Sequence, residues 1–253
     1  MFEIYIQELQ MILERIQREQ ATAIKQAGSI VADAIAAGGI VHTFGTGHSH
    51  LIAEEPFFRA GGLAAINPIL DERLMFLRGA LESTRAERDA GLSRALIEQE
   101  DISSRDASII ISNSGRNAAP VEMALEMKAR GVQVIAITNI QHSQASAPRN
   151  QSGKRLFELA DVVIDNCTPA GDALMTLPGL NARAGPSSTV AGAAIINSIM
   201  IEAASELLRR GEQISVLPSA NVDSTTADEL RRLLGRYRER IRYLDLETHI
   251  AIV

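Results

Sequence analysis

The sequence predicts an α/β fold in which helices cover a sheet of parallel strands. Two observations support this class. Wholly apolar runs that suit strands buried on both faces, such as SIII at 108–111 and VIAI at 134–137, alternate with longer stretches of helical periodicity. Strand and helix in alternation produce parallel strands joined by right-handed crossovers. We therefore expect one layered sheet with helices on its faces.

The first third of the chain shows this alternation. Apolar residues spaced mostly three and four apart over 3–37 predict one long helix or two in series. IVHTF (40–44) follows as a short buried strand, and a glycine turn leads into a helix over 49–60 that Pro56 weakens or kinks. AAINPIL (64–70) is the second expected strand.

The later part of the chain gives stronger signals of the same kind. Its clearest elements are a buried apolar strand, a capped amphipathic helix and a long, mostly apolar helix. In chain order we expect strand 107–112, helix 119–131, strand 132–139, a short helix 152–160, strand 161–165 and helix 187–211.

The whole chain, 1–253, is expected to form a single domain. A chain of 253 residues, 46% of them hydrophobic, is long enough for one sizeable core, and no linker or low-complexity stretch divides it. The segment 71–107 is charged and helix-prone without a strand signal, so we interpret it as a helical insertion. The segment 212–253 is interpreted as a C-terminal extension.

Charge and cysteine content exclude several classes of protein. A formal net charge of −6 argues against a nucleic-acid partner held through phosphate contacts. The one cysteine, Cys167, fits a reducing compartment, and we expect it to be a small buried filler. The charged, amphipathic N-terminus lacks a signal-peptide core, and no apolar run approaches about 20 residues. We therefore expect a cytoplasmic protein with no membrane partner.

Small polar residues and glycines follow the expected strands. GTGHS (45–49) follows the first strand, SNSGRN (112–117) the third, TNIQHS (138–143) the fourth and NCTPAGD (166–172) the fifth. Such residues fill turns and cap helices in any α/β protein. Two Ser/Gly-rich turns that open helices on neighbouring strands nevertheless favour an anion site, because helix N-termini and exposed N–H groups suit phosphate.

The first turn also has features of a dinucleotide site and of a metal site. A dinucleotide-binding turn has the pattern G-x-G-x-x-G. Gly45 and Gly47 match its first two glycines, but His50 occupies the position of the third. Asp71, after the second expected strand, could imitate the ribose-binding acid. A metal could use His48 and His50, but no further ligand is evident. We therefore expect no cofactor and no metal.

Two motifs resemble the sugar isomerase (SIS) phosphosugar-binding family. They are IVHTFGTGHS (40–49) and ASIIISNSGRNAAPVEMALEMKARGVQVIAITN (107–139), and the resemblance covers roughly residues 3–211. The chain is most similar to stand-alone, phosphoheptose-isomerase-like members. The resemblance implies a three-layer sandwich with a five-stranded parallel sheet of flavodoxin-like order, and an assembly of two or more copies.

The resemblance also implies which residues hold the sugar phosphate. Short O–H and N–H donors of both motif turns would surround the phosphate, together with the start of helix 187–211. The expected ligands are Gly45, Thr46, Gly47, Ser49, Ser112, Asn113, Ser114, Gly115, Asn117, Ser188 and Thr189.

Aldose–ketose isomerisation needs a base that moves a proton between adjacent carbons. Relatives carry a functional glutamate fourteen residues after the first motif glycine, and here that position is Arg59. We therefore expect Glu55, one turn earlier on the same helix face, to transfer the proton. Glu54 and Glu87 are the alternatives for this role. If Glu54 and Glu55 have no catalytic role, we expect them to lie on a solvent-exposed helix face.

The imidazole that assists ring opening is expected to be His48 or His142. His48 lies in the first turn, and His142 follows the fourth strand at the same edge of the sheet. Three functions remain open: a sugar-phosphate isomerase, an etherase or lyase of the muramic acid phosphate type, and a non-catalytic sensor. The apolar faces of 3–37 and 187–211 predict a homodimer or homotetramer.

Overall fold

The computed structural model describes residues 1–219 and 227–244. Five parallel strands form one sheet in the order β2-β1-β3-β4-β5, which confirms the predicted α/β class and flavodoxin-like order. In register, Val41 of β1 pairs with Ile66 of β2 on one side and Ala107 of β3 on the other. The strands are β1 (Val41–Gly45), β2 (Ile66–Pro68), β3 (Ala107–Ile111), β4 (Gln133–Thr138) and β5 (Val162–Asp165).

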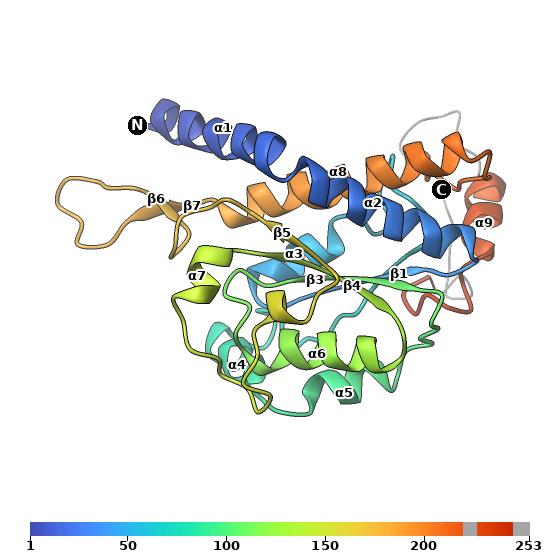
Figure 1. Cartoon of the computed structure of the whole chain (residues 1–253), viewed down its shortest axis with the longest axis horizontal. Coiled ribbons are helices and arrows are strands. Elements are labelled where there is room, and N and C mark those ends of the chain that lie inside the picture. Colours follow the sequence, from blue (N-terminus) through green and yellow to red (C-terminus); the bar gives the residue numbers. More distant parts are fainter. Residues whose placement is uncertain (220–226, 245–253) are drawn as a thin grey trace.

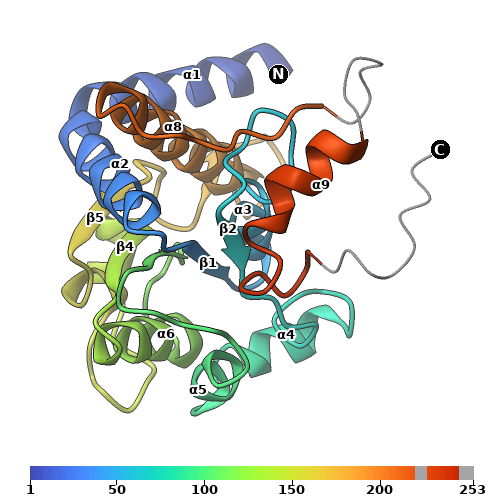
Figure 2. The same cartoon turned by 90° about the vertical axis from the view of Figure 1, so that its right-hand side faces the viewer.

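Helices cover both faces of the sheet, as Figures 1 and 2 show. One core lies between the sheet and a first helix layer, and includes Ile24, Val31 and Ile195. That layer consists of α1 (Phe2–Glu19), α2 (Ala21–Ala36), α3 (His48–Glu54) and α8 (Ser188–Arg209). A second core, which includes Phe44 and Met123, lies on the opposite face. It is covered by α4 (Ala80–Ala86), α5 (Leu92–Ile97) and α6 (Ala118–Ala129).

The long helix α8 is apolar enough, by length and composition, to cross a membrane. The expectation that no apolar run approaches about 20 residues, the length that spans a membrane, is therefore wrong. In the structure Ile195, Ile196 and Ile199 of this helix are buried in the first core, where α8 packs against α2 (Figure 1). Burial against other helices accounts for its apolar composition, as in the core helix of a globular domain.

Some elements differ from the prediction. The stretch 3–37 forms two helices in series, because Gln20 leaves helical geometry between them. The helix expected over 152–160 is only a 3₁₀ turn, Leu156–Glu158. Gly153 has a φ of +67°, which is outside helical geometry. The Leu156 N–H donates to the Gly115 carbonyl at 2.8 Å, so this segment is bonded to the turn after β3 in place of the hydrogen bonds of a helix.

Two elements lay outside the prediction. A short helix, α7 (Ile140–Gln144), starts directly after β4, where the Asn139 side chain caps it by accepting from the His142 N–H. A two-stranded hairpin, β6 (Ala173–Met175) and β7 (Ala184–Pro186), projects from the molecule before α8 (Figure 1). Both lie at the end of the sheet where the parallel strands finish.

The C-terminal part forms a small third core at the β2 edge of the sheet. Helix α9 (Ala227–Gly235) buries Leu230 and Leu234 against Ile40 and Ala65 (Figure 2). Of the predicted extension 212–253, the segments 220–226 and 245–253 lie outside the described residues. The predicted insertion 71–107 contains α4 and α5, with a loop between them that leads to the site.

Candidate functional site

A cleft of about 420 Å³ lies at the carboxyl ends of β1 and β3. This is the position at which open parallel sheets hold their ligands, and the volume suits a small molecule. The two motif turns form part of its wall. The turn residues that line it are Thr46, Gly47, His48, Ser49, Ser112, Asn113, Ser114 and Asn117.

The turn after β1 brings helix α3 unusually close to its strand. A side chain at Gly45 would collide with the Ser49 carbonyl, because a Cβ there would lie only 2.2 Å from that oxygen. Gly45 therefore shapes the turn but does not itself line the cleft. The Gly47 N–H donates to the Leu74 carbonyl at 2.8 Å, so this amide is occupied within the protein. The Ser49 side chain lines the cleft and has no hydrogen-bond partner among the described residues.

The turn after β3 is fixed in a similar way. Ser112 Oγ accepts the Gly115 N–H at 3.1 Å, so Gly115 supports the turn and lies outside the cleft lining. Asn113 Oδ1 accepts from Asn166 at 2.8 Å, which ties the ends of β3 and β5 together. Across residues 1–219 and 227–244, the Ser114 hydroxyl meets no hydrogen-bond partner. Ser49 and Ser114 thus offer free hydroxyls from both turns.

Glu87 joins the two turns from the segment that follows α4. Its carboxylate accepts from Thr46 Oγ1 at 2.9 Å and from Asn117 Nδ2 at 2.6 Å. Burial raises the pKa of Glu87, and the hydrogen bond from Thr46 and the charges of Arg88 and Arg149 offset only part of this rise. A buried carboxyl of raised pKa in a polar cleft is a candidate for proton transfer.

Two histidines line the cleft. The His48 ring packs on Phe76 with their ring centroids 4.8 Å apart. His142 comes from α7, and its Nδ1 accepts the Gly171 N–H at 3.2 Å. Because Nδ1 is an acceptor, the neutral ring carries its proton on Nε2. His142 can therefore present an N–H donor to a ligand.

The third histidine of this region faces elsewhere. His50 is buried, with its Nδ1 2.6 Å from a carboxylate oxygen of Glu54, and burial lowers its pKa. His48 and His50 therefore do not face one common site, as a metal ligated by both would require. Across residues 1–219 and 227–244, no group of three His, Cys, Asp or Glu side chains is arranged to hold a metal ion.

The expected base Glu55 lies outside the cleft lining. Its carboxylate forms an ion pair with Arg59, the residue at the family glutamate position, and accepts from Asn197 Nδ2 of α8 at 3.0 Å. The side chain therefore points toward α8, and its carboxylate is engaged by Asn197 and Arg59. The structure brings together the two motif turns, His48, His142 and Glu87, and leaves Glu55 apart.

The N-terminus of α8 contributes less than expected. Ser188 lines the cleft, but its N–H and Oγ both donate to the Asp172 carboxylate, at 2.6 and 3.0 Å. Thr189 is not among the lining residues. Asp172 therefore caps α8 with its own negative charge and occupies donors that would otherwise serve a phosphate.

Sequence reasoning missed Asp172, Phe76 and the α4 residues of the lining, Ala80, Ser83 and Thr84, and ranked Glu87 low. The signal for Asp172 was present, since it ends the polar turn after the fifth strand. The others come from the segment 71–107, whose path over the cleft no periodicity reveals.

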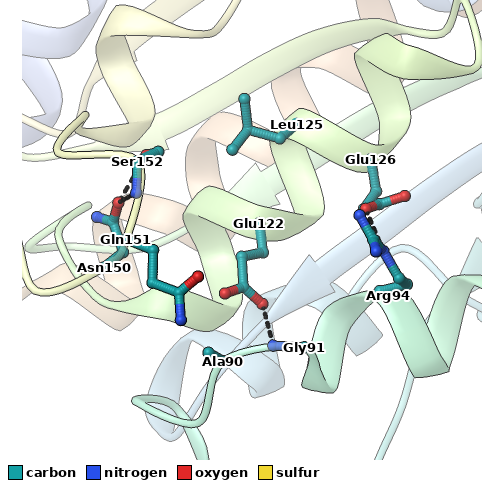
Figure 3. Close-up of a pocket in the computed structure, with 9 residues that line it drawn as sticks. All are labelled: Ala90, Gly91, Arg94, Glu122, Leu125, Glu126, Asn150, Gln151 and Ser152. Carbon is teal, nitrogen blue, oxygen red and sulfur yellow. Dashed lines mark hydrogen bonds and ion pairs between the residues drawn. The ribbon is translucent and has the colours of Figure 1, made fainter.

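A second cavity, of about 410 Å³, lies between α5, α6 and the loop at 150–152 (Figure 3). Its carboxylates are engaged within the protein. Glu122 accepts the Gly91 N–H at 2.7 Å, and Glu126 forms an ion pair with Arg94 at 2.8 Å. The charged side chains of this cavity are therefore satisfied within the protein, unlike the serine hydroxyls of the cleft at the strand ends.

Fold and cleft together define an α/β protein with a candidate small-molecule site built from two turns of glycines and small polar residues. The chain belongs to the SIS domain family, whose model matches residues 4–139. It is 40% identical over 245 residues, 96% of this chain and 98% of the relative, to a UPF0309 protein of Geobacillus thermodenitrificans. It is likewise 41% identical over 243 residues, 96% of this chain and 98% of the relative, to a UPF0309 protein of Listeria innocua.

A solved structure with a similar fold is the phosphoheptose isomerase of Neisseria gonorrhoeae. The two superpose with a TM-score of 0.54 at 15% sequence identity, over 81% of this chain and 97% of that chain. A likeness at this level of identity shows the fold.

Proposed function

We propose that the protein binds a phosphorylated sugar in the cleft at the strand ends and interconverts its aldose and ketose forms. One observation carries the proposal. Free hydroxyls of Ser49 and Ser114, from two different turns, line the same cleft as the buried carboxyl of Glu87 and the imidazole of His142. Unpaired donors suit a phosphate, and a carboxyl with an imidazole suits proton transfer on the sugar.

In this proposal the turn residues hold the phosphate. Ser49 and Ser114 donate their hydroxyls, and Asn113 and Asn117 add amide groups at the same wall of the cleft. Thr46 and Ser112 hold the turns in shape, since Thr46 donates to Glu87 and Ser112 accepts from Gly115. The free hydroxyls are neutral donors, so these turns bind a phosphate without a strong cation that would retain the product.

Glu87 is the proposed proton-transfer group, in place of the Glu55 expected from the sequence. As a carboxylate it takes the proton from the carbon beside the carbonyl to give an enediol and returns it to the former carbonyl carbon, while the proton of the neighbouring hydroxyl passes to the former carbonyl oxygen; the two transfers together exchange aldose and ketose. His142, with its proton on Nε2, is proposed to donate to the ring oxygen as the sugar opens. His48, held against Phe76, is the second candidate for that donor.

A panel of sugar phosphates tests the proposal. Thermal shift identifies the ligands, and turnover is then followed for each by conversion between aldose and ketose. We expect at least one sugar phosphate to raise the melting temperature and to be isomerised. Binding without any turnover would favour a sensor, release of a substituent would favour an etherase or lyase, and no binding at all would contradict the proposal.

We also propose that the protein is a cytoplasmic homodimer or homotetramer. Large apolar side chains are exposed on α1, among them Phe2 and Met11, and on α8, where Ile201 is exposed. Surfaces of this kind usually mark an interface between subunits. Sedimentation at micromolar concentration should therefore give a dimer or tetramer, and a monomer would contradict this part of the proposal.

A further inference from the structure

Three arginines that form no ion pair with any described residue lie close to one another beside the cleft. Backbone contacts fix their positions: the Arg149 N–H donates to the Arg116 carbonyl at 2.8 Å, and the Ala119 N–H donates to the Glu87 carbonyl at 3.0 Å, next to Arg88. The guanidinium groups of Arg88, Arg116 and Arg149 form no ion pair and no hydrogen bond with another of the described residues. We call these three residues the arginine patch.

The absence of partners sets the arginine patch apart from its surroundings. Nearby, Arg94 and Arg130 both pair with Glu126, and Arg155 pairs with Glu158. Within the patch Arg116 Nε is buried without a hydrogen-bond partner. Burial lowers the pKa of Arg116, and the positive charges of Arg149, Arg88 and Arg155 lower it further. Three cations beside the single carboxyl of Glu87 leave a local excess of positive charge, which attracts an external anion.

The arginine patch adjoins the wall of the cleft. Arg116 directly precedes Asn117, which lines the cleft and donates to Glu87, and Asn117 forms a backbone bridge with Arg149. Arg88 directly follows Glu87. The three arginines are not themselves part of the cleft lining; each is next in the chain, or bridged through the backbone, to Asn117 or Glu87, which are.

We propose that the arginine patch is a second anion subsite, and that the substrate is a sugar phosphate with a second anionic group, a carboxylate or a second phosphate. This inference rests on the proposed function, because it assumes that a sugar phosphate occupies the cleft. It assigns the patch to substrate selection and leaves the proton transfer to Glu87. Guanidinium groups bind carboxylate and phosphate alike, so the experiment separates the two.

Calorimetry with matched ligand pairs tests the inference. Fructose 6-phosphate is compared with fructose 1,6-bisphosphate, and glucose 6-phosphate with 6-phosphogluconate. In at least one pair the doubly anionic ligand should bind about tenfold more tightly or better, and its advantage should shrink at high salt. The double variant Arg116→Gln/Arg149→Gln should remove this advantage and leave the affinity for the singly phosphorylated partner unchanged.

Arg105→Gln is the matched control, since Arg105 lies at the opposite end of β3 and makes no ion pair among the described residues. It should keep the full advantage of the doubly anionic ligand. The double variant removes mutual repulsion, so its melting temperature should not fall. An equal affinity within both pairs, or an advantage that survives in the double variant, overturns the inference alone. If no sugar phosphate binds the wild type, the proposed function fails as well.

Discussion

The two ends of β1 carry similar polar side chains in different states. At the amino end, the buried carboxylate of Asp106 accepts from His42 Nε2 at 3.1 Å, from Arg240 at 2.8 Å and from the Ile40 N–H at 2.9 Å. At the carboxyl end, the hydroxyls of Ser49 and Ser114 and the guanidinium groups of the arginine patch have no hydrogen-bond or ion-pair partner among the described residues. Where the protein satisfies its own charges, the residues hold the fold together, and where it leaves them unsatisfied, they are ready for a ligand.

The pKa values of the two carboxyls express the same difference. Burial alone would raise the pKa of Asp106, but hydrogen bonds from His42, Arg240 and two backbone N–H groups outweigh it and lower the pKa well below its usual range. At Glu87 burial dominates and the pKa is raised. Asp106 is therefore held charged by the fold, and Glu87 is kept ready to exchange a proton.

The largest expected effect is on turnover at the carboxyl end. Glu87→Gln should lower turnover of an isomerised sugar phosphate by about 10²-fold or more, because it removes a general base, while ligand affinity changes little. Glu55→Gln is the matched control and should keep turnover, since Glu55 lies outside the cleft lining. Steady-state kinetics of both variants show whether Glu87 or Glu55 is the general base. A loss of turnover confined to Glu55→Gln would reverse the assignment.

The next largest effect is on stability at the amino end. Asp106→Asn removes the buried carboxylate that accepts from the buried His42 and from the partly buried Arg240, and should cost about 3–5 kcal/mol of unfolding free energy. Asp101 pairs with the same arginine at 2.9 Å, but its side chain is 66% exposed. Asp101→Asn should therefore cost about 1 kcal/mol or less. Urea denaturation measures both, and equal losses would contradict the distinction.

The fold was more predictable than the site. Strands such as Ala107–Ile111 are apolar apart from Ser108 because both faces of the sheet are covered, and that composition is visible in the sequence. The two motif turns were predicted because they directly follow such strands. The position of Glu87 could not be predicted, because the loop after α4 reaches the cleft through tertiary contacts to Thr46 and Asn117. For the same reason Glu55 was expected in the cleft, although its helix turns the side chain toward α8.

The smallest expected effect is a difference in how the carboxyls of Glu87 and Asp106 change the stability of the protein with pH. The raised pKa of Glu87 means that its contribution to stability is present below about pH 4.3 and is lost as pH rises through the folded-state pKa. Glu87→Gln should therefore melt higher than the wild type at pH 8, and the difference should vanish near pH 4. Asp106 has the opposite sign: its contribution is present above about pH 3.9 and is lost in stronger acid. Melting curves across this range would contradict the comparison if Glu87→Gln were less stable at pH 8.

The most direct test of the central claim is calorimetric binding of a sugar phosphate to Ser49→Ala/Ser114→Ala. The double variant removes two free hydroxyls from the cleft, each expected to supply a charge-assisted hydrogen bond of about 1.5–3 kcal/mol. Ser198→Ala is the control, because that hydroxyl is bonded to the Ala194 carbonyl on α8 and lines no part of the cleft. Affinity should fall by about 100-fold or more in the double variant and stay unchanged in the control. Affinity within twofold of the wild type in the double variant would show that the phosphate does not bind between these two turns.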